Sequence, residues 1–338
     1  MPLIQEHISL KPYNTFSIAV QARYFVEIFS ETELEEFLAT AGDQLGDMLV
    51  LGGGSNVLFT QDFPGLVVKI SIPGIKQESG SSAIIVEAGA GMVWNDFVQY
   101  CVNNNLAGVE NLSLIPGTVG ASPIQNIGAY GVELKDVFHS CTAYEIATGE
   151  KRIFSYEDCK FGYRDSVFKN ELKGQYIISS VSFKLNTLAN LNTQYGAIQS
   201  ELAIRNIVSP TIADISAIVS EIRVSKLPDP STIGNAGSFF KNPVIEKSKL
   251  EAIQKSYPEI VNYPVGNDYY KIAAGWLIES CGFKGKVVGE TGTWKNQALV
   301  LVNHGHATGQ EVYSFSEHII NVVCQKFGIK LEREVNIL

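Results

Sequence analysis

Hydrophobic positions follow two different periods along the chain. Short apolar runs between glycine-rich turns predict strands in "DMLVLGGG", "GLVVKI", "AIIVEAGAG" and "QYIISSVSFKL". Apolar residues spaced three and four apart predict amphipathic helices in residues 31–42, beginning at a Thr32 cap, and in residues 91–108. The residues expected to face inward are Leu34, Phe37 and Leu38 in the first helix and Val93, Phe97, Val98 and Cys101 in the second.

The helical period returns in residues 211–226, where isoleucines and valines recur on one face. Pro228 and Pro230 follow and end this helix, so we expect a domain boundary near residue 225. The final third has helix patterns in "KIAAGWLIESCGFKG" and "YSFSEHIINVVCQKFGI" and a strand pattern in "NQALVLVNHG". The whole pattern predicts an α+β protein with a smaller α+β domain in its last third.

Length, composition and charge narrow the class of protein. The chain has 338 residues, of which 45% are hydrophobic and 18% charged, as in ordinary globular proteins, and it has room for several domains. Its net charge is −9 and no Lys/Arg cluster is long enough to follow a nucleic-acid backbone, so we expect no nucleic-acid partner. An anionic ligand would have to be held by backbone amides and a few chosen cations.

No apolar run is long enough to span a bilayer, and "MPLIQEHISLKPYN" lacks the features of a signal peptide. We therefore expect a cytoplasmic protein with no membrane partner. The five cysteines form no CxxC pair, which argues against a disulfide framework or a zinc site. His304 and His306 lie close in sequence, but no cysteine or carboxylate cluster surrounds them, so we interpret them as a solvated loop and expect no metal.

The stretch "LVLGGGSNVLF", residues 49–59, is a strand that runs into three glycines. Glycine lets backbone N–H groups turn toward one point and approach an oxyanion closely. The stretch lacks the Lys-Ser/Thr ending of a P-loop and the spacing of a dinucleotide fingerprint. A tight hairpin turn is the alternative, but Ser55 and Asn56 can both donate to phosphate and favour an anion cradle.

A second glycine-rich stretch, "SLIPGTVGASPIQNIGAYGVEL", covers residues 113–134. Its glycines alternate with polar residues, a composition that suits a loop around a flat polar ligand better than a core. A long surface loop is the alternative, although loops of this length are uncommon without a role. Two separated glycine-rich loops together favour a nucleotide cofactor.

Three further places carry candidate chemistry, each with a structural alternative. Arg164, in "FGYRDSVFK", offers a bidentate fork for a carboxylate or forms an ion pair with Asp165. Ser238, in "GNAGSFFKNP", is a helix cap, a nucleophile or a proton source, and the GxSxG nucleophile pattern is missing around it. Glu332 and Glu334, in "LEREVNIL", share one face of an expected terminal strand and are either solvated or part of a site.

Taken together, these stretches resemble the UDP-N-acetylenolpyruvoylglucosamine reductases, also called UDP-N-acetylmuramate dehydrogenases. The matching pieces cover nearly the whole chain and run from "NTF" through "LGGGSNVLF", "IPGTVGASPIQNIGAYGVE", "GYRDSVFK", "KLPDP", "GNAGSFFKNP", "AAGWLIE" and "QALVLVN" to "LEREV". The extra segment 192–202 is similar to the loop of the family's longer type, in which Tyr195 would close over the substrate.

The resemblance implies an α+β flavoenzyme with the two-part FAD-binding domain of the vanillyl-alcohol-oxidase or PCMH type and a smaller α+β substrate-binding domain. Residues 1–70, with a C-terminal strand at 328–338, would form FAD-binding subdomain 1. Residues 71–225, including segment 192–202, would form subdomain 2, and residues 226–327 would bind substrate. We expect a monomer.

The resemblance also implies a cofactor and a set of site residues. FAD would bind non-covalently, and NADPH would donate hydride in the same pocket that later takes the substrate. The cofactor-binding residues would be Leu51, Gly52, Gly53, Gly54, Ser55, Asn56, Pro116, Gly117, Thr118, Gly120, Ala121, Ser122, Gln125, Asn126, Gly128 and Arg223. The substrate-binding residues would be Tyr195, Lys226, Asn242 and Gln297.

The implied reaction reduces UDP-N-acetylglucosamine enolpyruvate to UDP-N-acetylmuramate in peptidoglycan precursor synthesis. Hydride would pass from flavin N5 to the vinyl carbon, and charge would build up on the substrate as an enediolate. Arg164 and Glu334 would stabilise that charge, and Ser238 would protonate the enediolate carbon. The alignment to "EV" favours Glu334 over Glu332.

Three other functions compete with this interpretation. A flavin oxidase of the same fold often attaches FAD through a histidine near the phosphate loop, and residues 52–59 contain neither His nor Cys. A serine hydrolase would form an acyl-enzyme at Ser238 and contain no flavin. A non-catalytic binder of nucleotide sugars would keep its affinity for UDP after loss of Ser238 and Glu334.

Overall fold

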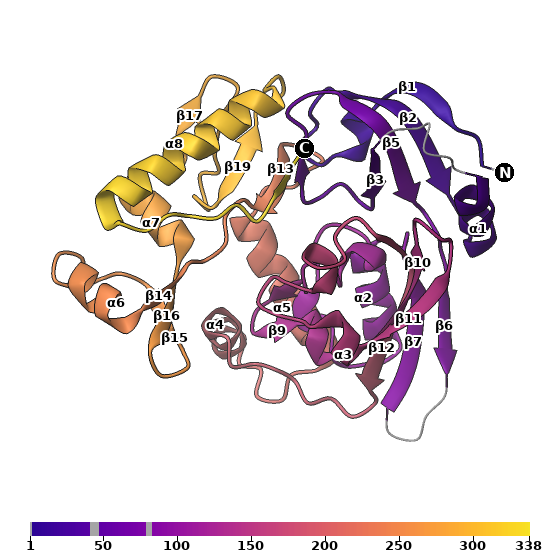
Figure 1. Cartoon of the computed structure of the whole chain (residues 1–338). Coiled ribbons are helices and arrows are strands. Elements are labelled where there is room, and N and C mark those ends of the chain that lie inside the picture. The colour runs from indigo at the N-terminus through magenta and orange to yellow at the C-terminus, as the bar shows by residue number, and fades with distance from the viewer. Residues whose placement is uncertain (1, 41–46, 79–82) are drawn as a thin grey trace. The chain divides into compact units, whose positions relative to one another are not determined.

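The computed structural model describes residues 2–40, 47–78 and 83–338 (Figure 1). The chain forms two compact units, each assembled from separate stretches of sequence. Unit 1 comprises residues 1–8, 22–54 and 63–224, and unit 2 comprises residues 9–21, 55–62 and 225–338.

The first sheet of unit 1 has the order β1-β2-β5-β3 and lies beside helix α1 (Figure 1). These elements are β1 (Gln5–Ser9), β2 (Gln21–Ile28), α1 (Glu31–Thr40), β3 (Met48–Leu51) and β5 (Phe63–Ile70). Both β2 and β3 pair with β5 in parallel, so β5 is covered on both edges, and four of its eight residues in a row are buried.

Helix α1 begins earlier than the sequence predicts. Ser30, not Thr32, accepts a hydrogen bond from the Glu33 N–H at 3.1 Å, and the Glu33 carboxylate accepts one from the Phe29 N–H at 2.7 Å. Ser30 is therefore the side-chain cap of α1, which makes the predicted Thr32 cap wrong. Leu34 and Phe37 are buried as predicted.

The second sheet of unit 1 is antiparallel, with the order β11-β10-β12-β7-β6. Its strands are β6 (Ile75–Glu78), β7 (Ala83–Gly89), β10 (Phe138–Glu145), β11 (Lys151–Ser155) and β12 (Tyr176–Asn186). The short elements around it are hairpin β8 (Gly128–Ala129) and β9 (Val132–Glu133), and helix α3 (Tyr156–Cys159). The strands predicted at β3, β5, β7 and β12 are confirmed.

Helix α2 (Trp94–Asn103) packs on this second sheet. The Phe97 and Phe183 rings lie 4.5 Å apart, and the Trp94 and Phe183 rings 5.9 Å apart. Val93 was expected to face inward, but it precedes the helix and is 50% exposed, so that prediction is wrong. Trp94 takes the inward place because its indole N–H donates to the Leu112 carbonyl at 2.9 Å, which satisfies the buried polar atom.

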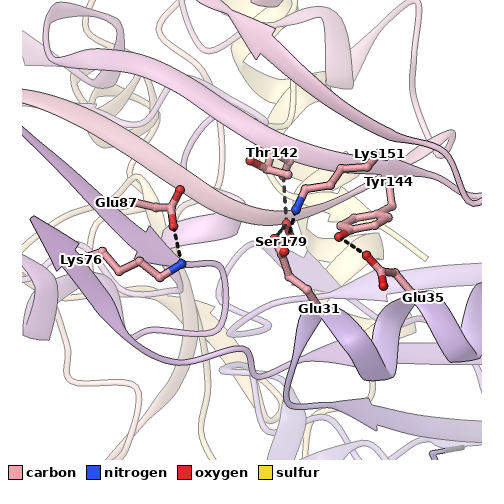
Figure 2. Close-up of polar contacts among 8 residues, drawn as sticks. All are labelled: Glu31, Glu35, Lys76, Glu87, Thr142, Tyr144, Lys151 and Ser179. Carbon is pink, nitrogen blue, oxygen red and sulfur yellow. Dashed lines mark hydrogen bonds and ion pairs between the residues drawn. The ribbon is translucent and has the colours of Figure 1, made fainter. Parts of the chain in front are cut away.

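A polar network ties α1 to the second sheet (Figure 2). The Glu31 carboxylate accepts hydrogen bonds from Ser179 on β12 and Lys151 on β11, both at 2.7 Å. One turn further along α1, Glu35 accepts from the Tyr144 hydroxyl of β10 at 2.8 Å. Burial favours the neutral form of Glu31, but the Lys151 and Ser179 hydrogen bonds outweigh it and hold the pKa of Glu31 below its ordinary value.

Helices α4 (Gly196–Ile204) and α5 (Ile212–Lys226) form a separate small core. Its buried members are Ile198, Leu202, Ile215, Ile218, Val219 and Ile222. The segment 192–202, predicted as a loop, lacks regular secondary structure only up to Tyr195, which is the N-terminal cap residue of α4. The predicted helix before Pro228 is confirmed as α5.

Unit 2 contains three small sheets and three α-helices (Figure 1). The sheets have the orders β13-β19-β18-β17, β14-β16-β15 and β20-β4. Their strands are β4 (Val57–Leu58), β13 (Gly234–Ser238), β14 (Val244–Glu246), β15 (Asn262–Val265), β16 (Tyr269–Ile272), β17 (Val287–Val288), β18 (Thr291–Thr293), β19 (Val300–Asn303) and β20 (Asn336–Ile337). The helices are α6 (Lys247–Gln254), α7 (Ala274–Ser280) and α8 (Gly309–Phe327).

The C-terminal segment differs from its predicted form. We expected an alternating strand that includes Glu332 and Glu334, but β20 contains only Asn336 and Ile337, which pair in parallel with β4. The Glu334 N–H instead donates to the Phe239 carbonyl at 2.8 Å. This segment therefore adds main-chain hydrogen bonds to two separate parts of unit 2.

Candidate cofactor and substrate site

The two glycine-rich loops of unit 1 lie against each other. A Cβ atom on Gly52 would be 2.5 Å from Thr118 Oγ1, and one on Gly53 would be 2.8 Å from Gly117 Cα. The contact at Gly53 is with backbone, which a change of rotamer cannot relieve, so only glycine allows this approach there. The structure thus brings together the segments 51–54 and 116–122 that the sequence predicts as a cofactor cradle.

The cradle contains one polar atom that the fold does not use. Thr118 is 6% exposed, and its hydroxyl is a buried group with no hydrogen-bond partner among the described residues. Buried polar groups are rarely left unsatisfied, so an orphan of this kind points to a missing ligand. A cradle of closely approaching backbone with a spare hydroxyl suits the pyrophosphate of a dinucleotide cofactor such as FAD.

The side chains of two other predicted cofactor residues form hydrogen bonds within the protein. The Ser122 hydroxyl donates to the Val119 carbonyl at 2.6 Å. The Asn126 amide donates to the Gly162 carbonyl at 2.9 Å and accepts from the Lys135 N–H at 3.0 Å. We therefore predict that FAD contacts these two residues mainly through their backbone atoms.

The remaining predicted cofactor residues lie in the same loops or at their ends. Leu51 ends β3, Gly54 has a φ of +61°, and Gly120 leaves no room for a Cβ, which would lie 2.4 Å from the Ala90 Cβ. Ala121 closes a short 3-10 turn, and Pro116 and Gln125 lie in the second loop. Ser55 and Asn56 belong to unit 2, where the Asn56 side chain donates to the Glu334 carbonyl at 3.3 Å.

Arg164 is fixed by the second glycine-rich loop. Its guanidinium donates to the carbonyls of Gly128 and Asn126, and it lies 5.4 Å from the centre of the Tyr163 ring. Its backbone has a φ of +54°, a conformation that non-glycine residues adopt rarely. Both observations indicate that the position of this guanidinium is tightly specified.

Tyr195 packs against a second tyrosine that the sequence analysis missed. The Tyr130 and Tyr195 rings meet edge to face with their centres 5.2 Å apart. Burial raises the pKa of Tyr130, and the nearby Arg223 guanidinium partly offsets it. Burial in turn lowers the pKa of Arg223, whose Nε donates to the Leu114 carbonyl at 3.2 Å.

Asn111, also missed, joins the segment of Tyr130 to the segment of Tyr195. It is 1% exposed, and its side-chain nitrogen donates to the Tyr130 carbonyl at 3.0 Å and the Asn192 carbonyl at 2.9 Å. A lone asparagine in a short helical turn carries no sequence signal, because its two partners lie 19 and 81 residues away.

Ser238 lies at the end of β13 in unit 2, so the structure rules out the helix-cap alternative. No helix follows it directly, which also departs from the strand–turn–helix of a hydrolase nucleophile elbow. Its neighbour Phe239 accepts the hydrogen bond from the Glu334 N–H, so the backbones of Ser238 and Glu334 lie close together. Glu332, by contrast, is an exposed residue in an ion pair with Lys241.

Two predicted substrate residues of unit 2 flank the first turn of α7. Asn242 Oδ1 accepts from the Ala274 N–H at 2.9 Å, and a Cβ on Gly275 would lie 2.8 Å from Gln297 Oε1. Lys226 is exposed and ends α5. Arg164, Tyr195 and Arg223 thus belong to unit 1, as the cradle does, and Ser238, Glu334, Asn242 and Gln297 belong to unit 2.

Among the described residues, no helix combines the length and apolarity that crossing a membrane requires.

Models of known protein families match both parts of the chain that carry the predicted site. An FAD binding domain model matches residues 22–155, and a model of the UDP-N-acetylenolpyruvoylglucosamine reductase C-terminal domain matches residues 229–338. These matches cover both glycine-rich loops as well as Ser238 and Glu334, and they confirm FAD as the cofactor.

Curated relatives match the chain over its whole length. UDP-N-acetylenolpyruvoylglucosamine reductase of Flavobacterium johnsoniae is 50% identical over 99% of both chains, and that of Pseudomonas aeruginosa is 47% identical over 99% of this chain and 98% of its own. The crystal structure of UDP-N-acetylenolpyruvylglucosamine reductase from Thermus caldophilus covers 100% of this chain and 99% of its own, with a TM-score of 0.68 and 22% identity, which shows a shared fold. The chain therefore belongs to the UDP-N-acetylenolpyruvoylglucosamine reductase family of FAD-dependent oxidoreductases, as the sequence motifs predict.

Proposed function

We propose that this protein reduces UDP-N-acetylenolpyruvoylglucosamine to UDP-N-acetylmuramate with NADPH, as a cytoplasmic step of peptidoglycan precursor synthesis. The enolpyruvyl ether takes up one hydride and one proton and becomes a lactyl ether, while NADPH becomes NADP⁺. The observation that carries the proposal is the close approach of Gly52 and Gly53 to Gly117 and Thr118. This cradle suits the FAD of a family that includes the Flavobacterium johnsoniae enzyme, which is 50% identical over 99% of the chain.

The protein's own part begins with holding the cofactor. FAD, when bound, supplies a carrier that accepts hydride from NADPH and delivers it to the substrate. Backbone N–H groups of the two glycine-rich loops would hold its pyrophosphate, and the Thr118 hydroxyl would gain the partner that it lacks. Arg223 would place a positive charge close by.

Arg164, Glu334 and Ser238 would then act on the substrate. Negative charge develops on the substrate carboxylate as hydride arrives, and the Arg164 fork matches two carboxylate oxygens. Glu334 would polarise the same carboxylate. Ser238 would donate its proton to the carbon next to the carboxylate, a positioned transfer that typically contributes about 10²–10⁴-fold.

Substrate selection would rest on groups that bind the UDP-sugar. Tyr195 would close over the substrate, Lys226 would face the diphosphate, and Asn242 and Gln297 would donate from their amide nitrogens. In this proposal residues 1–225, together with residues 328–338, carry FAD, residues 226–327 bind substrate, and the enzyme acts as a monomer.

A visible absorption spectrum under anaerobic conditions tests the proposed function. The purified protein should be yellow, bleach on addition of NADPH, and recover its colour with UDP-N-acetylenolpyruvoylglucosamine. Recovery with oxygen but not with the enolpyruvyl sugar would indicate an oxidase or another reductase. A colourless protein that takes up no FAD would reject a flavoenzyme, and an acyl-enzyme at Ser238 would then support a hydrolase.

A further inference from the structure

The ladder between β13 and β19 contains one extra residue directly before Ser238. Gly234 pairs with Asn303 and Asn235 with Val302, but the next pair is Ser238 with Val300. Between the last two of these pairs β13 advances by three residues and β19 by only two, which defines a β-bulge. Because side chains alternate between faces, the extra residue turns Ser238 to the face opposite the one that an unbroken ladder would give it.

Asn235 holds this bulge from within the strand. Its Oδ1 accepts from the Gly237 N–H at 2.9 Å, and its Nδ2 donates to the carbonyls of Ile233 at 2.9 Å and Pro228 at 3.3 Å. The side chain is 2% exposed, so water competes little for these bonds. Gly237 has a φ of +67°, the left-handed conformation that a bulge of this kind needs.

The "NTF" turn, residues 14–16, braces the same strand from outside. Thr15 accepts from the Asn235 N–H at 2.9 Å and donates its hydroxyl to the Asn235 carbonyl at 2.6 Å. Phe16 packs edge to face on Phe239, with ring centres 6.0 Å apart. The turn is itself tied by Asn14, whose side chain bonds the main chain of Leu10 and Ile18.

The main chain is fixed again immediately after Ser238. The Phe239 N–H donates to the Leu299 carbonyl at 2.9 Å, and the Phe239 carbonyl accepts from the Glu334 N–H at 2.8 Å. Apart from Ser238 itself, only Ala236 and Gly237 lie between these hydrogen bonds at Phe239 and those of Thr15 with Asn235. The orientation of Ser238 is therefore decided by the bulge.

We propose that Asn235, Gly237 and Thr15 are positioning residues for the reaction: they hold a one-residue bulge that presents the Ser238 hydroxyl to the carbon that it protonates. This inference rests on the proposed role of Ser238 as proton donor. It assigns a purpose to the "NTF" motif, which no step of the reaction uses.

Gly237→Ala tests the bulge with little steric disturbance, because nothing lies within 4 Å of the added Cβ and only the positive φ opposes it. In the holoenzyme we expect reoxidation by the enolpyruvyl substrate to slow by about tenfold or more, since misplacement by ~1 Å can cost about 10²-fold. Reduction by NADPH should stay within about twofold. Gly237→Asn should recover most of the rate, because asparagine tolerates the left-handed region.

Gly328→Ala is the matched control, with a φ of +66° and nothing within 4 Å of its Cβ position after α8. It should leave both half-reactions unchanged, and equal slowing in both variants would show that backbone strain alone explains the effect.

If Gly237→Ala does not fold, Thr15→Val tests the hydrogen bond between the Thr15 hydroxyl and the Asn235 carbonyl, with Thr15→Ser as its control. The same selective slowing of reoxidation is expected for valine only. Intact reoxidation in Thr15→Val would then overturn the inference.

A double-mutant cycle decides whether the bulge acts through Ser238. In a Ser238→Ala background, Gly237→Ala should slow reoxidation by less than about twofold more, because the group that it positions is gone. An undiminished additional loss would overturn the inference. If Ser238→Ala itself fails to slow reoxidation selectively, the proposed proton-donor role fails; if Ser238→Ala behaves as expected and Gly237→Ala is neutral, only the bulge inference fails.

Discussion

Left-handed backbone conformations at residues other than glycine gather around the candidate site of unit 1. Leu114, Asn126, Tyr130 and Arg164 have φ values between +45° and +57°. Each such residue costs on the order of 1–3 kcal/mol, which persists only where surrounding contacts offset it. Asn126 and Arg164 have these contacts through Gly162 and Gly128, so the site is held by its own loop geometry.

Arg164→Lys should slow reoxidation of the reduced enzyme by about 10²-fold or more while reduction by NADPH changes much less. Lysine keeps the charge but cannot reach two carbonyls and a carboxylate with a planar fork. Stopped-flow absorbance of the two half-reactions measures this split. Arg152→Lys, in an exposed ion pair with Asp158, is the control and should change neither rate; a wild-type reoxidation rate in Arg164→Lys would contradict the charge-stabilising role.

At the scale of elements, single polar residues join segments that are distant in sequence. Glu31 connects α1 to β11 and β12 (Figure 2), and Asn111 connects the segments of Tyr130 and Tyr195. Each is half-buried or buried and bonded to more than one partner. Removing either should therefore affect the joint between elements more than the elements themselves.

Glu31→Gln should lower Tm at neutral pH, and the difference from wild type should shrink in acid. The pKa of Glu31 is lowered in the fold, so its contribution is fully present above the ordinary value of 4.5 and is lost as pH falls through the lower folded pKa. Thermal melts of both proteins across pH 7 to 3 measure this convergence. Glu87→Gln, which breaks the exposed Lys76–Glu87 pair in the same sheet, should change Tm little at any pH. A constant difference between Glu31→Gln and wild type at all pH values would contradict the assignment.

Asn111→Ala should destabilise the protein by about 1–3 kcal/mol, because two carbonyls lose their donor in a buried place. It should also expose residues 190–195 to faster protease cleavage and hydrogen exchange. Asn104→Ala is a matched control, since Asn104 makes one exposed bond to the Tyr100 carbonyl, and it should cost less than about 0.5 kcal/mol. Equal protease resistance of Asn111→Ala and wild type would show that the Tyr195 segment is held by other contacts.

The helices and strands were largely predictable from the sequence, whereas the contacts that cap and connect them were not. The pattern S/T-x-x-E fits both Ser30 with Glu33 and Thr32 with Glu35. The sequence alone does not distinguish the two caps; in the fold Glu35 accepts from Tyr144, and Ser30 caps the helix. Val93 and Trp94 are both apolar, so the helical period could not decide which one is buried. The bulge before Ser238 depends on pairing with residues more than 60 positions away, and Gly237 is its only local trace.

At the scale of the whole molecule, the sequence order and the division into units do not coincide. Residues 9–21 and 55–62 belong with the C-terminal part in unit 2, although both are embedded in the N-terminal part of the sequence. The motif "LGGGSNVLF" is itself divided, with its glycines in unit 1 and Ser55 onward in unit 2. A substitution of one of these glycines therefore tests the cofactor cradle through contacts within unit 1.

Gly53→Ala should weaken FAD binding by at least about tenfold, because its Cβ would lie 2.8 Å from Gly117 Cα and must push the two glycine-rich loops apart. FAD binds the folded protein and raises its stability by RT ln(1 + [FAD]/Kd), so the gain in Tm on adding FAD to apoprotein should shrink in this variant. Gly174→Ala is the control, since its φ of +72° costs stability while nothing lies within 4 Å of the new Cβ. It should lower the Tm of apoprotein and holoprotein alike and keep the full gain from FAD. A full FAD-dependent gain in Gly53→Ala would mean that the close approach of the loops is a packing feature of unit 1 and that the cofactor is held elsewhere.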